Sequence, residues 1–311
     1  MLAYACSYLV SSHLYKWGNS YVNPYFRGEY SANKEILSLL SGVVFSLIAG
    51  KALDWFEASG NLYGGFVFIT LCMLVSSICN FIALCLMKKN VKMTNEPKMK
   101  LRRIINHTLN NKQFQYIVIL DIMRNIAAYL TLGFLGTFKT KDLMFSIGTV
   151  QMINIFAYIC RCLVSKPFGR YADRHSYVKV LELGYIIAAT AYAVNMFTSQ
   201  NTRWLIVLFT VLYFISDAAI NANSLNVLYS YVKSDYFAYA AAIKNSISGI
   251  FGFSASLLSS RLLQYVQSNG NSFFSLNIYG QQLLSAMSCI MFLLAFLFAK
   301  LFIEKQEIVG H

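Results

Sequence analysis

Charged residues are scarce in this chain of 311 residues: Asp, Glu, Lys and Arg together make up 13%, against about 25% in soluble domains. Proline is also rare, with 3 residues, whereas hydrophobic residues reach 57% and aromatic residues 15%. This composition excludes an ordinary soluble domain and predicts a membrane protein.

The chain also lacks the sequence patterns of metal sites and of catalysis. Its seven cysteines form no CxxC pair and its four histidines are scattered, so no metal site, cofactor or disulfide framework is expected. An aspartate-rich metal–diphosphate motif, a GxSG motif with a partner histidine and an HxxxxD motif are all absent from the sequence. We therefore expect no enzymatic activity.

Long apolar runs are the main feature of the sequence. A membrane-spanning helix needs about 20 predominantly apolar residues. A shorter apolar run opens the chain at 1–15, and eight candidate spans follow at 35–52, 62–87, 115–137, 143–161, 180–198, 204–222, 245–266 and 281–303. The sequence thus predicts an all-α, polytopic membrane protein with about nine transmembrane helices in the lipid bilayer.

Basic residues are distributed unequally between the two sides of these spans. If the connection after Leu86 is cytoplasmic, 20 of the 26 lysines and arginines are cytoplasmic, among them Arg161 and Lys244 at the ends of two spans. Five lie on the opposite side, including Lys139, and Arg124 remains inside a span. The positive-inside rule then predicts a cell (plasma or inner) membrane protein with a cytoplasmic C-terminus. This topology accounts for the net charge of +13, so nucleic acid binding is not expected.

The longest polar connector, 88–113, separates two groups of spans. It is rich in lysine and arginine, which predicts a cytoplasmic linker that can hold anionic lipid headgroups. We therefore divide the chain into the remainder of an N-terminal helical bundle at 1–87, this linker, and a C-terminal six-helix bundle at 114–311.

Small residues recur at every fourth position in two spans and indicate an internal repeat. Such residues let helix backbones approach closely in a membrane. At an offset of 210 residues two series coincide: Ser38, Gly42, Ser46 and Gly50 in the first, and Ser248, Gly252, Ser256 and Ser260 in the second. The second half places four spans before its small-residue helix, whereas the first half has only the short opening run. The repeat therefore predicts that the first three helices of an N-terminal bundle are missing before Met1.

The most polar stretch between two spans is GRYADRHSYVK at 169–179. It resembles the loop signature of the major facilitator superfamily, G-x-L-A-D-R-x-G-R-[KR]-[KR]. The positions that fit are Gly169, Ala172, Asp173, Arg174 and Lys179, and those that depart from it are Tyr171, Ser176 and Val178. The resemblance extends over the whole chain, as helices four (in part) to twelve of the family's twelve. It implies two pseudo-repeated helical bundles and secondary active transport of a small solute by alternating access.

The resemblance also implies a cytoplasmic gate formed by Gly169, Arg170, Asp173, Arg174 and Lys179. Asp173 can pair with Arg170 or Arg174, and it can face the positive N-terminal end of the small-residue helix that starts near Lys34. Such contacts close one side of a transporter in one conformation and break in the other. The alternative is that the motif only sets the topology and that Asp173 is solvated.

Ionisable residues inside predicted spans indicate a functional site, because they are costly in a membrane. The expected substrate or coupling cavity consists of Asp121, Arg124, Asn125, Tyr129, Gln151, Asn154, Tyr158 and Asp217. Two interpretations remain open. In the first, Arg124 binds an anionic substrate group and an aspartate carries a coupling proton. In the second, Arg124 and an aspartate form a neutral structural pair.

The expected function is therefore transport of an unidentified small molecule, with a proton or another ion as coupling partner under the first interpretation. The alternative is a transport-inactive membrane fragment, or an interaction subunit, derived from a truncated transporter. Uptake of solute into vesicles would distinguish the two.

Overall fold

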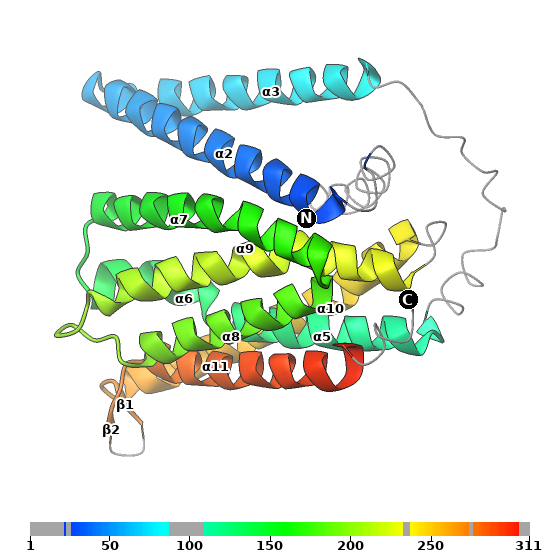
Figure 1. The fold of residues 1–311 in the computed structure, drawn as a ribbon. Helices are drawn as coiled ribbons and strands as arrows, with labels where there is room; N and C mark the ends of the chain where they lie inside the picture. The colour runs from blue at the N-terminus through cyan, green and yellow to red at the C-terminus, as the bar shows by residue number, and fades with distance from the viewer. Residues whose placement is uncertain (1–21, 23–25, 87–108, 233–236, 274–275, 305–311) are drawn as a thin grey trace. The chain divides into compact units, whose positions relative to one another are not determined.

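The computed structural model describes residues 22, 26–86, 109–232, 237–273 and 276–304, which form long helices and one short hairpin (Figure 1). The predicted opening run at 1–15 and most of the predicted linker at 88–113 lie outside the described residues. Two compact units are present: one is Ile36–Glu96, and the other combines Met1–Glu35 with Pro97–His311. The first turns of α2 (Arg27–Ala58) therefore group with the C-terminal helices.

The smaller unit is a helical hairpin made of the rest of α2 and α3 (Leu62–Leu86). Gly60 turns the chain between them with a φ of 72°, a conformation that glycine adopts without steric cost. Asn61 then caps α3, because its side-chain oxygen accepts a hydrogen bond from the Gly64 amide at 3.0 Å.

The larger unit contains six long helices and several short elements. Its elements after α2 are α5 (Lys112–Tyr129), α6 (Leu132–Thr137), the π-helix η2 (Phe138–Asp142), α7 (Ile147–Arg174), α8 (Tyr177–Met196), α9 (Leu205–Tyr231), α10 (Phe237–Ser268), β1 (Ser272–Phe273), β2 (Leu276–Asn277), α11 (Gly280–Phe298) and the π-helix η4 (Ala299–Glu304). The two short strands pair antiparallel, with Ser272 opposite Asn277.

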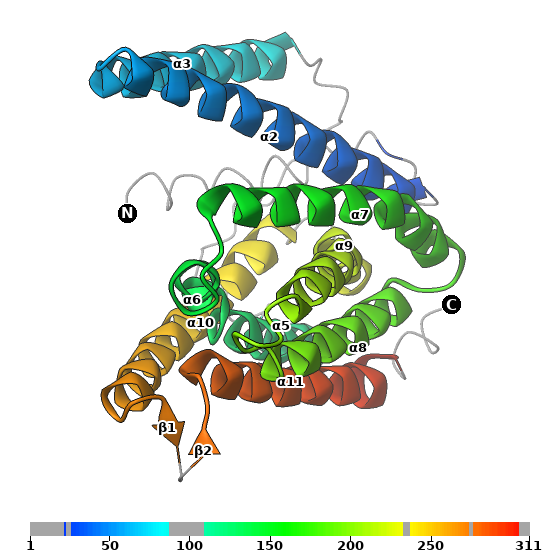
Figure 2. The same ribbon diagram turned by 90° about the vertical axis from the view of Figure 1, so that its left-hand side faces the viewer.

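Side-by-side contacts join the six long helices of the larger unit in the order α7, α9, α8, α11, α5 and α10 (Figure 2). Aromatic rings fill the space between α8, α9 and α11. Tyr192 is fully buried there, with its ring centroid 5.3 Å from that of Phe209 and 5.4 Å from that of Phe292. Burial of rings of this size supplies most of the packing energy at such a contact.

Seven helices in the described part of the chain are long and apolar enough to cross a membrane. The remaining long helix, α10, has 32 residues but carries Lys244 and several serines. Each of the eight predicted spans falls on a helix. The structure is thus that of an all-helical, multi-pass membrane protein.

The helices extend further than the apolar runs that predicted them. α2 begins at Arg27 rather than near Lys34, and α7 continues to Arg174. The stretch 169–179 was expected to be a turn, but only His175 and Ser176 separate α7 from α8. Ser176 starts the next helix, because its hydroxyl accepts hydrogen bonds from two amides of the first turn of α8.

The predicted span 115–137 is interrupted, because α5 ends at Tyr129 and α6 begins at Leu132. Polar contacts from α11 hold the break in place. Gln281 donates its side-chain amide to the Thr131 carbonyl at 3.2 Å, and the hydroxyls of Thr131 and Ser288 share a hydrogen bond. All three side chains are buried.

The second series of small residues brings α10 onto α5. A Cβ placed on Gly252 would lie 2.7 Å from the Tyr129 ring, and one placed on Gly133 would lie 3.8 Å from the Ser256 hydroxyl. In the first series, a Cβ on Gly42 or Gly50 would meet no described atom within 4 Å. Close packing at small residues is therefore present on α10 in the described structure.

Gly252→Leu should destabilise the protein, because the new side chain would push α10 away from α5 at a cost of about 1–3 kcal/mol. Gly249→Leu is the matched control on the same helix: a Cβ there meets no atom within 4 Å, so its effect should stay within about 0.5 kcal/mol. Chemical denaturation of the purified protein in detergent measures both. Equal effects of the two substitutions would contradict the packing described here.

Candidate functional site

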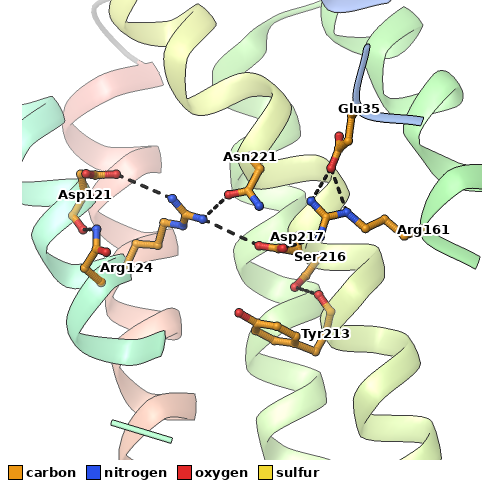
Figure 3. Close-up of polar contacts among 9 residues, drawn as sticks. Glu35, Asp121, Arg124, Arg161, Tyr213, Ser216, Asp217 and Asn221 are labelled. Carbon is orange, nitrogen blue, oxygen red and sulfur yellow. Dashed lines mark hydrogen bonds and ion pairs between the residues drawn. The ribbon is translucent and has the colours of Figure 1, made fainter. Parts of the chain in front are cut away.

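Six ionisable side chains inside the helices form one continuous chain of charges. In order of contact they are Glu35, Arg161, Asp217, Arg124, Asp121 and Lys244, which come from α2, α7, α9, α5, α5 and α10. We call this set the charge chain. Acids and bases alternate along it, and the three carboxylates balance the three cations. Figure 3 shows five of its members, from Glu35 to Asp121.

Arg161 forms the tightest contacts of the charge chain. Its Nη1 lies 2.6 Å from Asp217 Oδ2, and its Nε donates a hydrogen bond to Glu35 Oε1 at 2.8 Å. Arg161 stands roughly 20 Å from the C-terminal end of α7, at 1.5 Å per residue. It is therefore a buried residue of the helix interior. Arg161 was expected in the connection after a span, whereas α7 continues well beyond the apolar run, so Arg161 is a helix residue and not a loop residue.

Arg124 lies between two carboxylates and touches neither tightly. Its guanidinium nitrogens are 3.9 Å from Asp121 Oδ1 and 3.7 Å from Asp217 Oδ1 (Figure 3). Its closest partner is the side-chain oxygen of Asn221, to which it donates a hydrogen bond. Arg124 is thus shared between two acids on different helices.

Asp121 and Lys244 form the most deeply buried pair of the charge chain. Lys244 Nζ lies 3.0 Å from Asp121 Oδ2, and their side chains are only 3% and 7% exposed. Ser248 donates a further hydrogen bond to the same carboxylate oxygen at 2.7 Å. Lys244 was expected just before the start of a span, whereas α10 begins two turns earlier, at Phe237, so Lys244 lies within the helix.

Three members of the charge chain were not among the predicted cavity residues: Glu35, Arg161 and Lys244. Helical spacing could have revealed them. Arg161 follows Tyr158 by three residues and continues the polar face of α7, and Lys244 precedes Ser248 by one turn. A hydropathy criterion left these residues outside the predicted spans, because a charged residue ends an apolar run whether or not the helix ends there.

Of the predicted cavity residues, the structure brings Asp121, Arg124 and Asp217 together. The others lie near this group or on α7. Asn125 donates to the Asp121 carbonyl of its own helix at 2.8 Å, and Tyr129 is exposed beside α10.

The three predicted α7 residues make separate contacts. Gln151 is exposed, whereas Asn154 accepts a hydrogen bond from Lys139 Nζ at 3.5 Å. The Tyr158 ring packs edge-on against Phe214 at a centroid distance of 4.8 Å.

The predicted gate residue Asp173 contacts the beginning of α2. Its two carboxylate oxygens accept hydrogen bonds from the amides of Gly28 at 2.7 Å and Glu29 at 2.8 Å, and Tyr177 donates its hydroxyl at 3.0 Å. These amides belong to the first turn of α2, where unpaired N–H groups and the helix dipole favour a negative charge. In the described structure Asp173 therefore binds the helix end and forms no ion pair with Arg170 or Arg174.

Two glycines allow this approach of α7 to α2. A Cβ on Gly169 would lie 2.6 Å from the Gly28 carbonyl oxygen, and one on Gly28 would lie 2.5 Å from the Gly169 carbonyl oxygen. Neither position has room for a side chain. Gly28 was not predicted, and its role follows only from the contact.

Three basic residues of α7 and α8 form weaker ion pairs. Arg170 and Lys166 lie 3.2 and 3.5 Å from Glu29, and Lys179 lies 4.0 Å from Glu304. Arg170 and Lys179 are about half exposed, so each pair is worth at most about 1 kcal/mol. Arg174 is exposed.

No protein-family model matches the chain, and no curated protein matches it as a relative. The geometry of the charge chain and of the Asp173 contact is therefore the basis for a functional proposal.

Neutralising one member of the Lys244–Asp121 pair should be far more harmful than neutralising both. Lys244→Met or Asp121→Asn alone should cost about 3–5 kcal/mol, because each leaves a buried charge without its partner. The double substitution should recover most of that loss, and Lys300→Met, an exposed control, should have little effect. Denaturation of the four variants measures the coupling. Additive losses would contradict the pairing.

Proposed function

We propose that the protein is a secondary active transporter of the major facilitator type, which moves a small solute by alternating access. The charge chain is the observation that carries this proposal. Ionisable side chains inside a membrane are costly and by default serve a functional site, and here six of them lie on five helices. Within the proposal, α2 and α10 are equivalent helices of two pseudo-repeated bundles.

The pairing within the charge chain can be exchanged without creating an unpaired charge. Arg124 is nearly equidistant from Asp121 and Asp217, and Asp217 also contacts Arg161. A shift of Arg124 toward either acid leaves the other acid with a remaining cation, Lys244 or Arg161. Two arrangements of similar energy are what an alternating-access transporter requires of its interior.

The contact of Asp173 with α2 supports a closed cytoplasmic side in this conformation. It joins the two helices through hydrogen bonds to a charged group, each worth about 1.5–3 kcal/mol, which is small enough to break and re-form. The basic residues Lys166, Arg170, Arg174 and Lys179 gather at the same end of α7 and α8. By the positive-inside rule they support a cytoplasmic location for this end, in a cell membrane.

Glu35 is the best candidate for a coupling carboxylate. Asp121 and Asp217 each lie near two cations, whereas among the described residues Glu35 forms an ion pair with Arg161 alone, and its second oxygen is buried with no described hydrogen-bond partner. Separation of α2 from α7 would remove that one cation. A proton or another cation would then have to neutralise Glu35, which links ion binding to opening.

A membrane interaction subunit is the second candidate function. The exposed residues of α3 favour this second function. Large apolar side chains of α3, such as Phe66, Leu71 and Phe81, are exposed within the described structure. Transport by the purified chain distinguishes the two candidates.

Arg124→Gln should abolish transport while leaving membrane abundance normal, because the shared cation between Asp121 and Asp217 is lost. The measurement is solute-driven proton flux in proteoliposomes loaded with a pH-sensitive dye and challenged with pools of metabolites. Arg261→Gln, which removes an exposed arginine, is the control. Loss of abundance with Arg124→Gln would instead support a purely structural pair, and an absence of flux with any solute would favour the interaction subunit.

Asp173→Asn should shift the conformational equilibrium toward an open cytoplasmic side by about 1.5–3 kcal/mol, because the first-turn amides of α2 lose a charged acceptor. Spin labels at Tyr30 and Tyr171, two exposed positions on α2 and α7, report the separation by pulsed electron resonance in a background without other cysteines. Arg174→Gln is the exposed control. Unchanged distance distributions in Asp173→Asn would rule out the gating role.

A further inference from the structure

Lys139 is a buried cation outside the charge chain. Its side chain is only 6% exposed, and its Nζ donates one hydrogen bond, to Asn154 Oδ1 at 3.5 Å. No carboxylate among the residues that the structure describes forms an ion pair with it. Lys139 was expected in a connection between two spans, whereas the structure places it in the π-helix η2 with its side chain buried.

The local structure shows that this burial is specific to Lys139. Lys139 and Lys141 lie in the same π-helical segment, η2, yet Lys141 is exposed. Short π-helical segments occur often at functional sites, where they reorient a side chain. A buried ammonium group without a counter-charge is strongly unfavourable, whereas an exposed lysine costs nothing.

The acidic side chains described near Lys139 do not neutralise its charge. The three carboxylates of the charge chain already balance its three cations. The acid nearest in sequence, Asp142, is partly exposed and forms no ion pair with Lys139 in the described structure. No described carboxylate therefore supplies a counter-charge to Lys139.

The surroundings of Lys139 fit a small anion. Asn154 lies on the polar face of α7, one turn from Gln151, which is exposed. The buried ammonium group of Lys139 thus lies within hydrogen-bond distance of one side-chain amide, that of Asn154, and Gln151 adds a second amide one turn away on the same helix. Lysine binds carboxylate and phosphate groups as a point charge, and amides add directed hydrogen bonds.

We infer that Lys139 and Asn154 bind the anionic group of the transported solute, a carboxylate or a phosphate, near the non-cytoplasmic end of the helices. This inference rests on the proposed transport function and adds the chemical class of the solute. It also gives the predicted polar face of α7 a role that the charge chain does not use.

The test uses the full chain, purified into phosphatidylcholine nanodiscs. Thermal unfolding is followed while sodium acetate, succinate, citrate, phosphate or sulfate is titrated against sodium chloride at constant ionic strength. At least one of these anions should raise the unfolding midpoint of the wild type saturably. Lys139→Gln should weaken this binding by about tenfold or more, because a charge-assisted contact is lost. Lys139→Arg should retain it, and Lys141→Gln, from the same segment, should match the wild type.

Several outcomes would overturn the inference: no anion stabilises the wild type, Lys139→Gln keeps full affinity, or Lys141→Gln is equally impaired. Repeating the titration in nanodiscs with added phosphatidylglycerol distinguishes binding of a soluble anion from binding of a lipid headgroup. Stabilisation only by that lipid would also overturn it. Anion binding without uptake in proteoliposomes would keep the anion site at Lys139 and Asn154 and refute the transport function. Uptake of uncharged solutes that Lys139→Gln does not affect would keep the transport function and refute the anion site.

Discussion

Pairing of buried charges is the constraint on which the larger unit of this protein depends. In a low-dielectric interior, each member of the charge chain needs a neighbour of opposite sign, and the next member shares that neighbour. Because the six residues lie on five helices, the requirement acts between helices and not only within them. It also explains why the first turns of α2 group with the C-terminal helices: Glu35 binds Arg161, Arg27 lies over the Tyr229 ring at 4.4 Å, and the α2 backbone binds Asp173.

Two contacts between α2 and α7 differ in depth but act on the same pair of helices. Asp173 binds the first amides of α2 at the helix end, and Arg161 binds Glu35 about 10 Å further along α2. Since both helices are rigid over this length, neither contact can open widely while the other persists. The close approach of Gly28 and Gly169 requires the same alignment. Under the proposed function, a small energetic change at either contact would be transmitted to the other, and the buried charge at Glu35 would be coupled to the gate at Asp173.

The sequence predicted the helices well and the buried charges only in part. Long apolar runs located all eight helical segments, because the membrane leaves few other structures for them. The same runs placed Arg161 and Lys244 at span ends, since hydropathy treats a charge as solvent-exposed and cannot know that a partner from another helix neutralises it. Asp121, Arg124 and Asp217 were identified because apolar residues surround them in sequence. That Arg161 connects Asp217 to Glu35 required knowledge of which helices are neighbours, and a single sequence does not contain that information.

Among the described residues, Arg161 is paired with carboxylates, whereas Lys139 is not, and both cations contact α7 or belong to it. This difference links solute binding to the conformation of α7 under the proposed function. Asn154 and Arg161 are seven residues apart, so they share one face of α7 at a separation of roughly 10 Å. At one position the helix meets Lys139, whose charge no described carboxylate balances. At the other, Arg161 of the helix forms ion pairs with Glu35 and Asp217 of the charge chain. Under the proposed function, an anion bound at Lys139 and Asn154 would pull on the same helix face that holds Arg161. Its binding energy could then favour one pairing of the charge chain over another, but only to the extent that the anion binds the two arrangements with different affinity.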